Sequence, residues 1–501
     1  MNQQLPMVIV VLPLFGTIAG FCTGWWARKM PFILAIMALG GSFTGAVVVA
    51  SGVMKTGPLH YHISGWIPPF GIEYRIDHLN ALLLVLISFL ALATAVYARS
   101  SVEKEMPDRV FLFWCLYLLL ITGLLGIAVT GDLFNLFVLL EVASLAGYAL
   151  VAAGDRRAAV AGFRYLVIGT VGACFYLLGV GYLYIATGTL NIKDLAVLLP
   201  PLYGSGTVIT AFIFILAGLA IKIALFPFHA WQPDAYTHAP SAVSVIISTA
   251  AAKTFTYALI RVMFSVFTID FMRSNAPMTG VVCWTGAASI IIGSVYAIAQ
   301  DNLKRMLAYS SIANVGYLVL GIGLCGATSL GLKPVVVHLV NHALIKGAMF
   351  MAACAVIYRQ ELRHISGLQG LSRQMPVTAL MLVLASLSMI GLPPGGGFVS
   401  KWYLILASIE SGQWGFVAVI FVSTLLMLVY FWRVIEMIYI RPPLSEPAPV
   451  TRWSGEQPLG MMIPCVVLSV LSFAIGLVWM SGALDGLIQG VNLNFGLGGV
   501  P

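Results

Sequence analysis

Long apolar segments that follow one another with few charges inside them decide what this chain can fold into. A bilayer core about 30 Å thick requires roughly 20 apolar residues per helix, so each such segment predicts one membrane-spanning helix. The runs are continuous rather than alternating, which argues against the strands of a membrane barrel. The sequence predicts an all-α polytopic membrane protein with about fourteen spans, at residues 5–24, 30–52, 76–97, 110–128, 131–152, 163–186, 207–225, 241–265, 279–299, 306–326, 335–357, 376–409, 414–439 and 459–481.

The composition supports a chain that faces lipid. Hydrophobic residues make up 60% of it and charged residues only 9%, whereas a soluble domain carries about 25% charged residues to wet its surface. The net charge of +8 comes from Lys and Arg in short loops, not from a basic patch with interleaved aromatics, which argues against nucleic acid as a partner. None of the seven cysteines forms a C-x-x-C pair, so we expect small buried hydrophobes and no metal or cofactor.

Lysine and arginine in the loops predict the orientation, because cytoplasmic loops are enriched in them. The loops after even-numbered spans hold five: Lys55, Arg75, Lys193, Arg273 and Lys333. The loops after odd-numbered spans hold fifteen: Arg28, Lys29, Arg99, Lys104, Arg109, Arg156, Arg157, Arg164, Lys304, Arg305, Arg359, Arg363, Arg373, Arg441 and Arg452. We therefore expect the odd-numbered loops in the cytoplasm and both termini outside it, in the inner (plasma) membrane of a cell. The first segment lacks the charged start and cleavage site of a signal peptide, which predicts a membrane helix.

Two predicted spans are interrupted. The seventh continues into LFPFHAWQPDAYTHAP, and the twelfth contains GLPPGGG at its middle. Such breaks free backbone groups and are tolerated only where protein or water satisfies them. Interrupted helices at matching places in two halves indicate an inverted repeat and a transport site, although two simple proline kinks remain an alternative. The predicted division is 1–109 (helices 1–3), 110–268 (first repeat, helices 4–8), 269–440 (second repeat, helices 9–13) and 441–501 (helix 14 and a short tail).

Charged residues occupy the middle of several spans. Glu141, Lys253 and Lys346 lie at the centres of the fifth, eighth and eleventh spans, while Lys222 and Lys401 flank the two breaks. Each ionisable group at the bilayer centre costs about 2.5–3.5 kcal/mol, so these groups need partners, internal water or neutralisation. The alternative is a static ion pair with a purely structural role, which would explain the presence of one pair of these charges. Charges in five spans, two of them broken, favour proton translocation along the middle of the membrane.

The eleventh span carries a polar stripe. His338, His342 and Lys346 follow one another at intervals of four residues and therefore share one helix face. A metal site would need a third ligand, and a lysine is a poor neighbour for a cation. Hydrogen bonding between helices is an alternative for His342. We expect a polar lane, because imidazole and amine groups can both pass protons.

Further polar residues lie near the breaks and the span ends. His229, Asp234 and His238 follow the seventh span, where they could form a cytoplasmic proton entrance or simply satisfy the broken backbone. Asp132 is expected to cap the fifth helix, since a carboxylate favours a helix N-terminus. Arg261 is expected near the outer boundary, in a structural role.

Several motifs carry a family resemblance. They are GDLFNLFVLLEVASLAGYAL, GLAIKIALFPFHAWQPDAYTHAPSAVSVIISTAAAKTFTYALIR, QDNLKRMLAYSSIANVGYLVLG, HLVNHALIKGAMF and GLPPGGGFVSKWY. As an ordered set they resemble the antiporter-like subunits shared by Mrp-type sodium/proton antiporters, respiratory complex I and membrane-bound hydrogenases. The first motif, followed by FRYLVIGTVGACFYLLGVGYLY, looks most like the D-type subunit of Mrp antiporters.

The resemblance implies roles for individual residues. Glu141 matches the family's glutamate, Lys222 its partner lysine, Lys253 the central lysine and Lys401 the terminal site, while His338 and Lys346 match the polar eleventh helix. It implies a proton-translocating subunit of a multisubunit cation/proton antiporter rather than a stand-alone enzyme. Other membrane subunits would be its partners, protons its cargo, and sodium a further cargo by analogy only. A proton-pumping subunit of a redox complex and a scaffold that does not transport are the alternatives.

Overall fold

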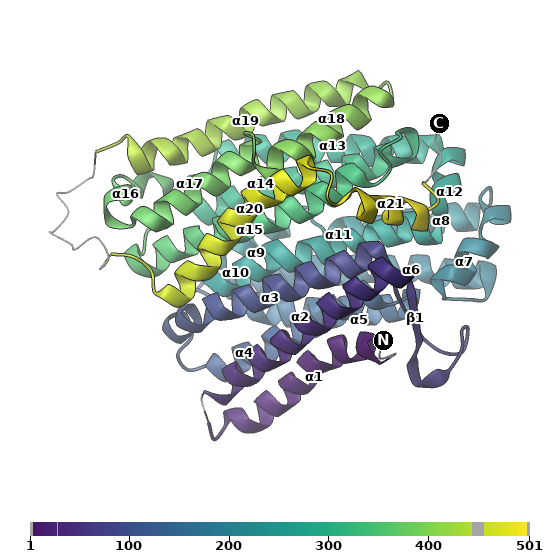
Figure 1. Cartoon of the computed structure of the whole chain (residues 1–501), viewed down its shortest axis with the longest axis horizontal. Coiled ribbons are helices and arrows are strands. Elements are labelled where there is room, and N and C mark those ends of the chain that lie inside the picture. The colour runs from purple at the N-terminus through teal and green to yellow at the C-terminus, as the bar shows by residue number, and fades with distance from the viewer. Residues whose placement is uncertain (1–3, 28, 443–454, 498–501) are drawn as a thin grey trace.

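The structure, a computed structural model, describes residues 4–27, 29–442 and 455–497, and most of these lie in helices that run along one elongated bundle (Figure 1). Twelve helical segments in these residues are long and apolar enough to cross a membrane. Eleven of them are α1 (Leu5–Gly24), α2 (Met30–Thr56), α3 (His78–Glu105), α4 (Val110–Val129), α5 (Leu133–Ala152), α6 (Ala158–Thr187), α13 (Ala276–Ile298), α14 (Leu303–Leu324), α15 (Lys333–Gln360), α19 (Trp414–Tyr439) and α20 (Leu459–Met480).

The predicted eighth span is a composite helix. It consists of α10 (Ser241–Ile246), the π-helical η3 (Ile247–Ala251), α11 (Ala252–Arg261) and the π-helical η4 (Val262–Val266). A π-helical turn is wider than an α-helical one and occurs frequently at functional sites. Nothing in the apolar sequence of this span indicates the two irregularities.

The two interrupted spans are broken as predicted. The seventh is α8 (Gly206–Lys222) followed by α9 (Trp231–His238), and the twelfth is α17 (Pro376–Ile390) followed by α18 (Gly396–Glu410). Gly391, at φ +99°, ends α17 in the left-handed conformation that glycine adopts most easily. With these two broken helices, the structure accounts for all fourteen predicted spans.

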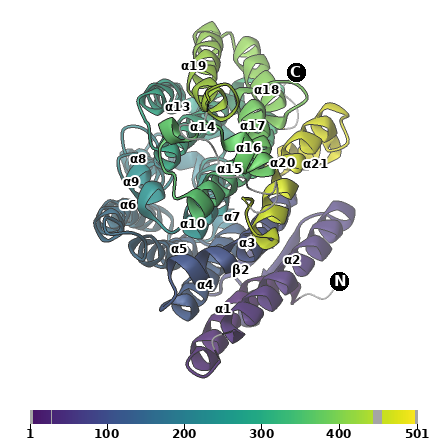
Figure 2. The ribbon, with the colours of Figure 1, turned by 90° about the vertical axis from the view of Figure 1, so that its left-hand side faces the viewer.

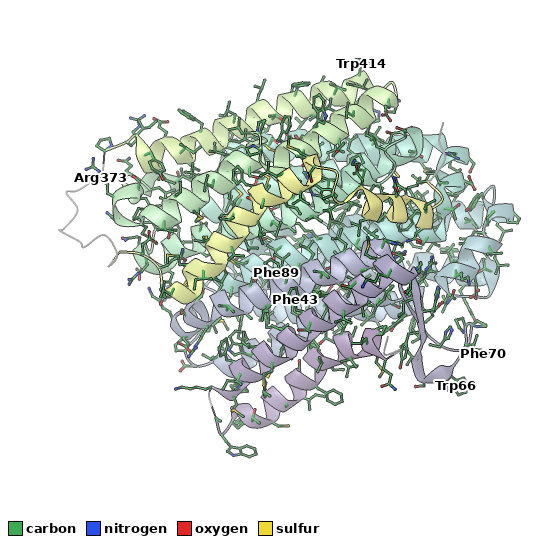
Figure 3. All side chains as sticks on the ribbon, viewed as in Figure 1. Phe43, Trp66, Phe70, Phe89, Arg373 and Trp414 are labelled. Atoms are coloured by element: carbon green, nitrogen blue, oxygen red, sulfur yellow. The ribbon has the colours of Figure 1, made fainter. Side chains whose placement is uncertain are left out.

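Short elements lie outside the spans. The strands β1 (Leu59–His62) and β2 (Glu73–Ile76) form an antiparallel hairpin, which is absent from the predicted elements. Trp66 and Phe70 project from its loop (Figure 3). The remaining short elements are η1 (Ile63–Gly65), α7 (Ile192–Leu198), η2 (Pro200–Leu202), α12 (Thr268–Ser274), η5 (Cys325–Ala327), η6 (Ile365–Gly367), α16 (Leu371–Gln374) and α21 (Asp485–Asn494).

The bundle shields its middle helices from the surroundings. Seen from one end, α15 lies near the centre and α1 and α2 form a layer at one edge (Figure 2). Helix α15 packs against α10, α14, α17, α18 and α20. In the most apolar stretch of the composite eighth span, 100% of the residues are buried inside the protein, and in that of α15 the share is 94%. In the corresponding stretches of α1 and α19 the share is only 33%. The helices with central charges are therefore surrounded by protein.

The structure leaves two sequence predictions open. The chain begins at the same end of the bundle as β1, α7 and α12, and α21 returns to that end (Figure 1), as an even number of crossings requires. Which end faces the cytoplasm stays a prediction, and Arg28 and Arg452 of the charge count lie outside the described residues. The division into 1–109, 110–268, 269–440 and 441–501, with its inverted repeat, also stays a prediction.

The orientation can be tested by thiol labelling from one side. Phe70, in the hairpin loop, is 88% exposed, and Glu361 is exposed at the opposite end, directly after α15. We expect a membrane-impermeant maleimide to label Phe70→Cys in intact cells and Glu361→Cys only in inside-out vesicles. The parent chain is the control, because it holds free cysteines of its own. The reverse labelling pattern would contradict the predicted orientation.

Candidate functional site

The fifth and seventh spans meet in a buried ion pair. Lys222 Nζ lies 2.7 Å from Glu141 Oε1 and also donates to Ser144 Oγ at 2.8 Å and to Tyr148 Oη at 3.3 Å. These three partners lie on one face of α5, since they are separated by three and four residues. The Lys222 side chain is 3% exposed and that of Glu141 is 21% exposed. The structure thus places together the two residues for which the family resemblance implied a pair.

The end of α8 holds Lys222 in place. Lys222 is the last residue of this helix, where the helix dipole favours a positive charge. The break that follows leaves carbonyl groups without their helical donors, and Trp231 Nε1 donates to the carbonyl of Ile221 at 3.0 Å. Trp231 itself stacks on Tyr165 of α6 with 4.0 Å between the ring centroids. A protein side chain therefore satisfies part of the broken backbone.

Lys253 occupies the composite eighth span and has no carboxylate partner in the described residues. Its side chain is among the largest that are completely buried, at 1% exposure. Nζ donates to the carbonyl of Ser248 at 2.6 Å, and Ser248 lies within the π-helical η3. The irregular turn thus supplies an oxygen that solvates the buried amine.

Helix α15 carries the polar lane. His338 Nδ1 lies 3.0 Å from Ser400 Oγ of α18, and its ring lies 5.7 Å from that of His342. Both ring nitrogens of His342 are buried without a hydrogen-bond partner among the described residues. Lys346 donates to the carbonyl of Leu307 at 2.8 Å and to Ser310 Oγ. The alternative that His342 is a satisfied helix–helix contact therefore finds no support in the geometry.

Lys401 forms hydrogen bonds across the break of the twelfth span. Its Nζ donates to the carbonyls of Ile390 at 2.8 Å and Met389 at 3.2 Å, which are the last carbonyls of α17. It also lies 5.7 Å from the centre of the Tyr317 ring, where a cation is attracted by the aromatic face. The residue has a structural role at the break in addition to any role in transport.

These groups lie on elements that follow one another across the bundle. Helix α8 packs against α11, and α15 packs against η3, α14 and α18. A narrow cavity whose lining includes Lys222, Tyr236 and Ala251 is too small for a water molecule. The elements that carry the row thus pack against one another, and this cavity between Lys222 and η3 has no room for water.

The three residues predicted near a proton entrance do not form one site. Asp234 makes ion pairs with Arg164 at 2.8 Å and Arg305 at 3.1 Å, so it holds α9 against α6 and α14. His229 lies in the break, with its Nδ1 buried and unpartnered within the described residues. His238 pairs with Asp155 at 3.2 Å. Of the two interpretations left open, backbone and interhelical support fits Asp234, while His238 reaches a cavity.

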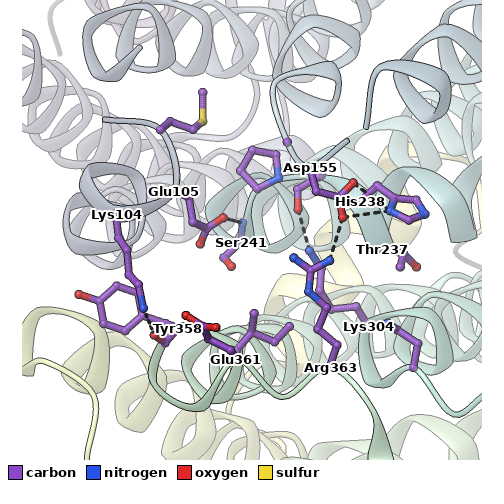
Figure 4. A pocket seen from close by; sticks show the side chains of 16 residues that line it. Lys104, Glu105, Asp155, Thr237, His238, Ser241, Lys304, Tyr358, Glu361 and Arg363 are labelled. Atoms are coloured by element: carbon purple, nitrogen blue, oxygen red, sulfur yellow. Dashed lines mark hydrogen bonds and ion pairs between the residues drawn. The ribbon is translucent and has the colours of Figure 1, made fainter. Parts of the chain in front are cut away.

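That cavity has a volume of about 450 Å³ (Figure 4). Its lining includes Lys104 and Arg363, which belong to the loops predicted to be cytoplasmic. His238 and Asp155 line it, and Arg363 Nη1 completes the cluster at 2.8 Å from Asp155 Oδ2. Burial raises the pKa of the Asp155 carboxyl, but the hydrogen bonds from Arg363 and His238 outweigh it and hold this pKa below its usual value. Lys304 is predicted only as a loop charge, whereas the structure buries it beside the cavity at 5% exposure.

The expected cap at Asp132 is confirmed, and Arg261 has an ion-pair partner, while its place near the outer boundary stays a prediction. Asp132 caps α5, since its Oδ1 accepts from the backbone amide of Asn135 at 2.7 Å. Arg261 forms an ion pair with Asp77, at 2.6 Å between Nη1 and Oδ2. The described residues contain no group of three or more His, Cys, Asp or Glu side chains arranged to hold a metal ion.

Known proteins share this arrangement of spans. The family described as "NADH:quinone oxidoreductase/Mrp antiporter, TM" matches residues 130–427, a range that includes every residue of the row from Glu141 to Lys401. The chain belongs to this family. It is an antiporter-like membrane subunit of the kind found in Mrp-type and complex I-type assemblies.

Individual relatives come from both kinds of assembly. The chain is 46% identical over 494 residues to the N subunit of the NADH-quinone oxidoreductase of Desulforudis audaxviator, covering 95% of this chain and 96% of the relative. It is 28% identical over 488 residues to the D subunit of the Na(+)/H(+) antiporter of Bacillus subtilis, covering 97% and 96%. Its fold is similar to a chain of the membrane-bound sulfane sulfur reductase, an archaeal respiratory membrane complex, with a TM-score of 0.88, 29% identity and 98% coverage of both chains.

Proposed function

We propose that this chain translocates protons along the row of buried side chains in the middle of the membrane. The observation that carries the proposal is the Glu141–Lys222 pair at 2.7 Å, followed on adjacent elements by three more buried lysines and two histidines. Ionisable groups inside a bilayer are retained mainly where they transport charge. The row consists of Glu141, Lys222, Lys253, Lys346, His342, His338 and Lys401.

The ion pair would act as the loading step. At a separation of about 4 Å and an effective dielectric near 20, the attraction between a carboxylate and an ammonium group is about 4 kcal/mol. That energy changes a protonation equilibrium by about a thousandfold. Moving Glu141 away from Lys222 would therefore release a proton from the amine, and closing the pair would hold one there.

The following groups would carry the proton onward. A lysine takes up a proton only if its amine can become neutral, and Lys253 and Lys346 have no carboxylate partner in the described residues to fix their charge. His342 has two ring nitrogens without a protein partner among those residues, so it can accept a proton at one and donate from the other. This arrangement favours transfer from Lys253 towards Lys401.

The closed cavity beside Lys222 would serve as the gate. Because it has no room for water, a movement of Tyr236 or η3 that widens it would let a proton pass from Lys222 towards Lys253. Such a motion could be driven by neighbouring subunits of a larger assembly, which the relatives' names and the sulfane sulfur reductase complex support. A scaffold role is disfavoured, because the row of charges is intact.

Two assemblies fit this function. The motifs resemble the D-type subunit of a Mrp antiporter, and a relative named as the D subunit of a Na(+)/H(+) antiporter is 28% identical. The relative named as the N subunit of an NADH-quinone oxidoreductase is 46% identical over nearly the whole chain, and this higher identity favours the redox complex of the two. In either assembly the row conducts protons. Sodium transport is inferred from the resemblance alone. The residues of the row do not support it, because the positive charges of the lysines would repel sodium.

Removing the carboxylate of the pair tests the proposal. We expect Glu141→Ala and Glu141→Gln to abolish proton transport by the assembled complex. Without the carboxylate, Lys222 has no ion pair whose formation and separation could hold and release a proton. Transport would be measured with a pH-sensitive dye in vesicles that contain the complex.

The matched control is Glu103→Gln, because Glu103 lies on α3 with a side chain that is 63% exposed. We expect this variant to transport at the wild-type rate, and all variants to retain the complete set of subunits. Wild-type transport by the assembled Glu141 variants would refute the proposal.

The partner class can be identified by purifying the native complex through a tag on this chain. From the relative that is 46% identical, we expect co-purifying subunits with iron–sulfur centres, visible in their electron paramagnetic resonance spectra. Small antiporter subunits without such centres would show a Mrp-type assembly instead. Recovery of the chain alone would contradict both.

A further inference from the structure

A second cavity, apolar in its lining, lies near one end of the bundle and apart from the row. Its volume is about 340 Å³, within the range of about 300–1,000 Å³ that is usual for ligand pockets. Its walls come from the end of η4, from α12, from the start of α13, from the end of α14 and from the start of α19. Helix α12 lies at the end of the bundle opposite α16 (Figure 1), so the cavity lies where several helices begin or end.

The cavity reaches from the border of the membrane into its apolar part. The span Pro277–Ile298 has 22 residues and covers about 33 Å, which is the thickness of a bilayer core. The start of α13 therefore marks the border. Trp284 lines the cavity eight residues after Ala276, the first residue of α13, which is about 12 Å along the helix. Its side chain is 63% exposed, so this wall of the cavity faces the surrounding lipid.

Small residues beside large apolar ones create the space. A Cβ atom added at Gly280 would meet no atom within 4 Å, and Ala327 is a further small residue of the lining. Phe264, Ile269 and Phe416 are apolar walls. Water gains few hydrogen bonds in such a cavity, whereas a hydrocarbon chain that enters it leaves no polar group unsatisfied.

The border end of the cavity carries a positive charge with a weak partner. Arg273, in the last turn of α12, is 51% exposed and lies 4.0 Å from Asp270, which is 74% exposed. Exposed ion pairs contribute little, and no acidic side chain of the described residues lines the cavity. The guanidinium group is therefore available to an anion, and its planar set of donors matches a phosphate group.

We propose that this cavity binds a phospholipid, with one acyl chain between α12, α13 and α14 and the phosphate on Arg273. The proposal does not depend on the proposed function. A soluble anion would use Arg273 and leave the apolar walls uncovered, and a hydrocarbon alone would leave the arginine unused. A phospholipid carries both groups, in the order in which the cavity presents them from the border of the membrane inwards.

The test uses the whole complex in vesicles that contain a phosphatidylglycerol with a photoreactive diazirine along one acyl chain. After illumination, the cross-linked peptides are identified by mass spectrometry. We expect cross-links within residues 279–284 and 322–327. Gly280→Leu should reduce them at least tenfold, because the new side chain enters the open space of the cavity. Gly181→Leu is the matched control, since Gly181 lies within α6 and a Cβ atom there also meets nothing within 4 Å.

The phosphate contact is tested with Arg273→Gln and with a second lipid. A diacylglycerol that carries the same photoreactive chain has no phosphate, so we expect it to give at least fivefold fewer cross-links in the wild-type complex. Arg273→Gln should lower the yield from phosphatidylglycerol to that of diacylglycerol. Lys55→Gln, at the exposed end of α2, should leave the yield unchanged.

Three results would overturn the proposal. Equal cross-linking in the wild-type and Gly280→Leu complexes would show that the chain does not enter the cavity. Equal yields from the two lipids would show that no phosphate is bound. The absence of cross-links at 279–284 and 322–327 in the wild-type complex would show that another group, such as a neighbouring subunit, covers the cavity.

Discussion

Amines buried in an apolar bundle must be solvated by the protein, and much of the structure follows from this constraint. Within the row, only Lys222 meets a carboxylate of the described residues, at 2.7 Å from Glu141. Lys253 and Lys401 are instead solvated by backbone carbonyls, one in the π-helical η3 and the others at the end of α17. The irregular helices therefore do more than bend the bundle. They supply oxygens where a regular helix would keep its carbonyls in its own hydrogen bonds.

The same constraint explains which helices lie inside. The composite eighth span and α15 are almost completely covered by protein, whereas α1 and α19 leave most of their surface open to lipid or partners. Carbonyl-bound lysines can become neutral more easily than lysines locked to carboxylates, because no fixed negative charge holds the proton. A row with one true ion pair, at the Glu141 end, is thus suited to load a proton at the pair and pass it along the following amines.

Residue chemistry made the spans and breaks predictable. The length of each apolar run predicts where a helix crosses the bilayer. Pro227 and the prolines after Gly391 predict the two breaks. The π-helical segments were not predictable, because nothing in the local residue types separates η3 from a regular helix. The β1–β2 hairpin was not predictable for another reason, because four-residue strands give little periodic signal. The burial of Lys304 depends on helices distant in sequence.

The most direct test of the row is to remove its central member. Lys253→Met keeps most of the side-chain volume but removes the only amine in the row on the composite eighth span, between the Glu141–Lys222 pair and α15. We predict that the complex assembles and that its proton flux in vesicles falls by at least tenfold. Lys55→Met, at the exposed end of α2, should transport normally. A wild-type proton flux through assembled Lys253→Met complex would show that protons do not pass along this row.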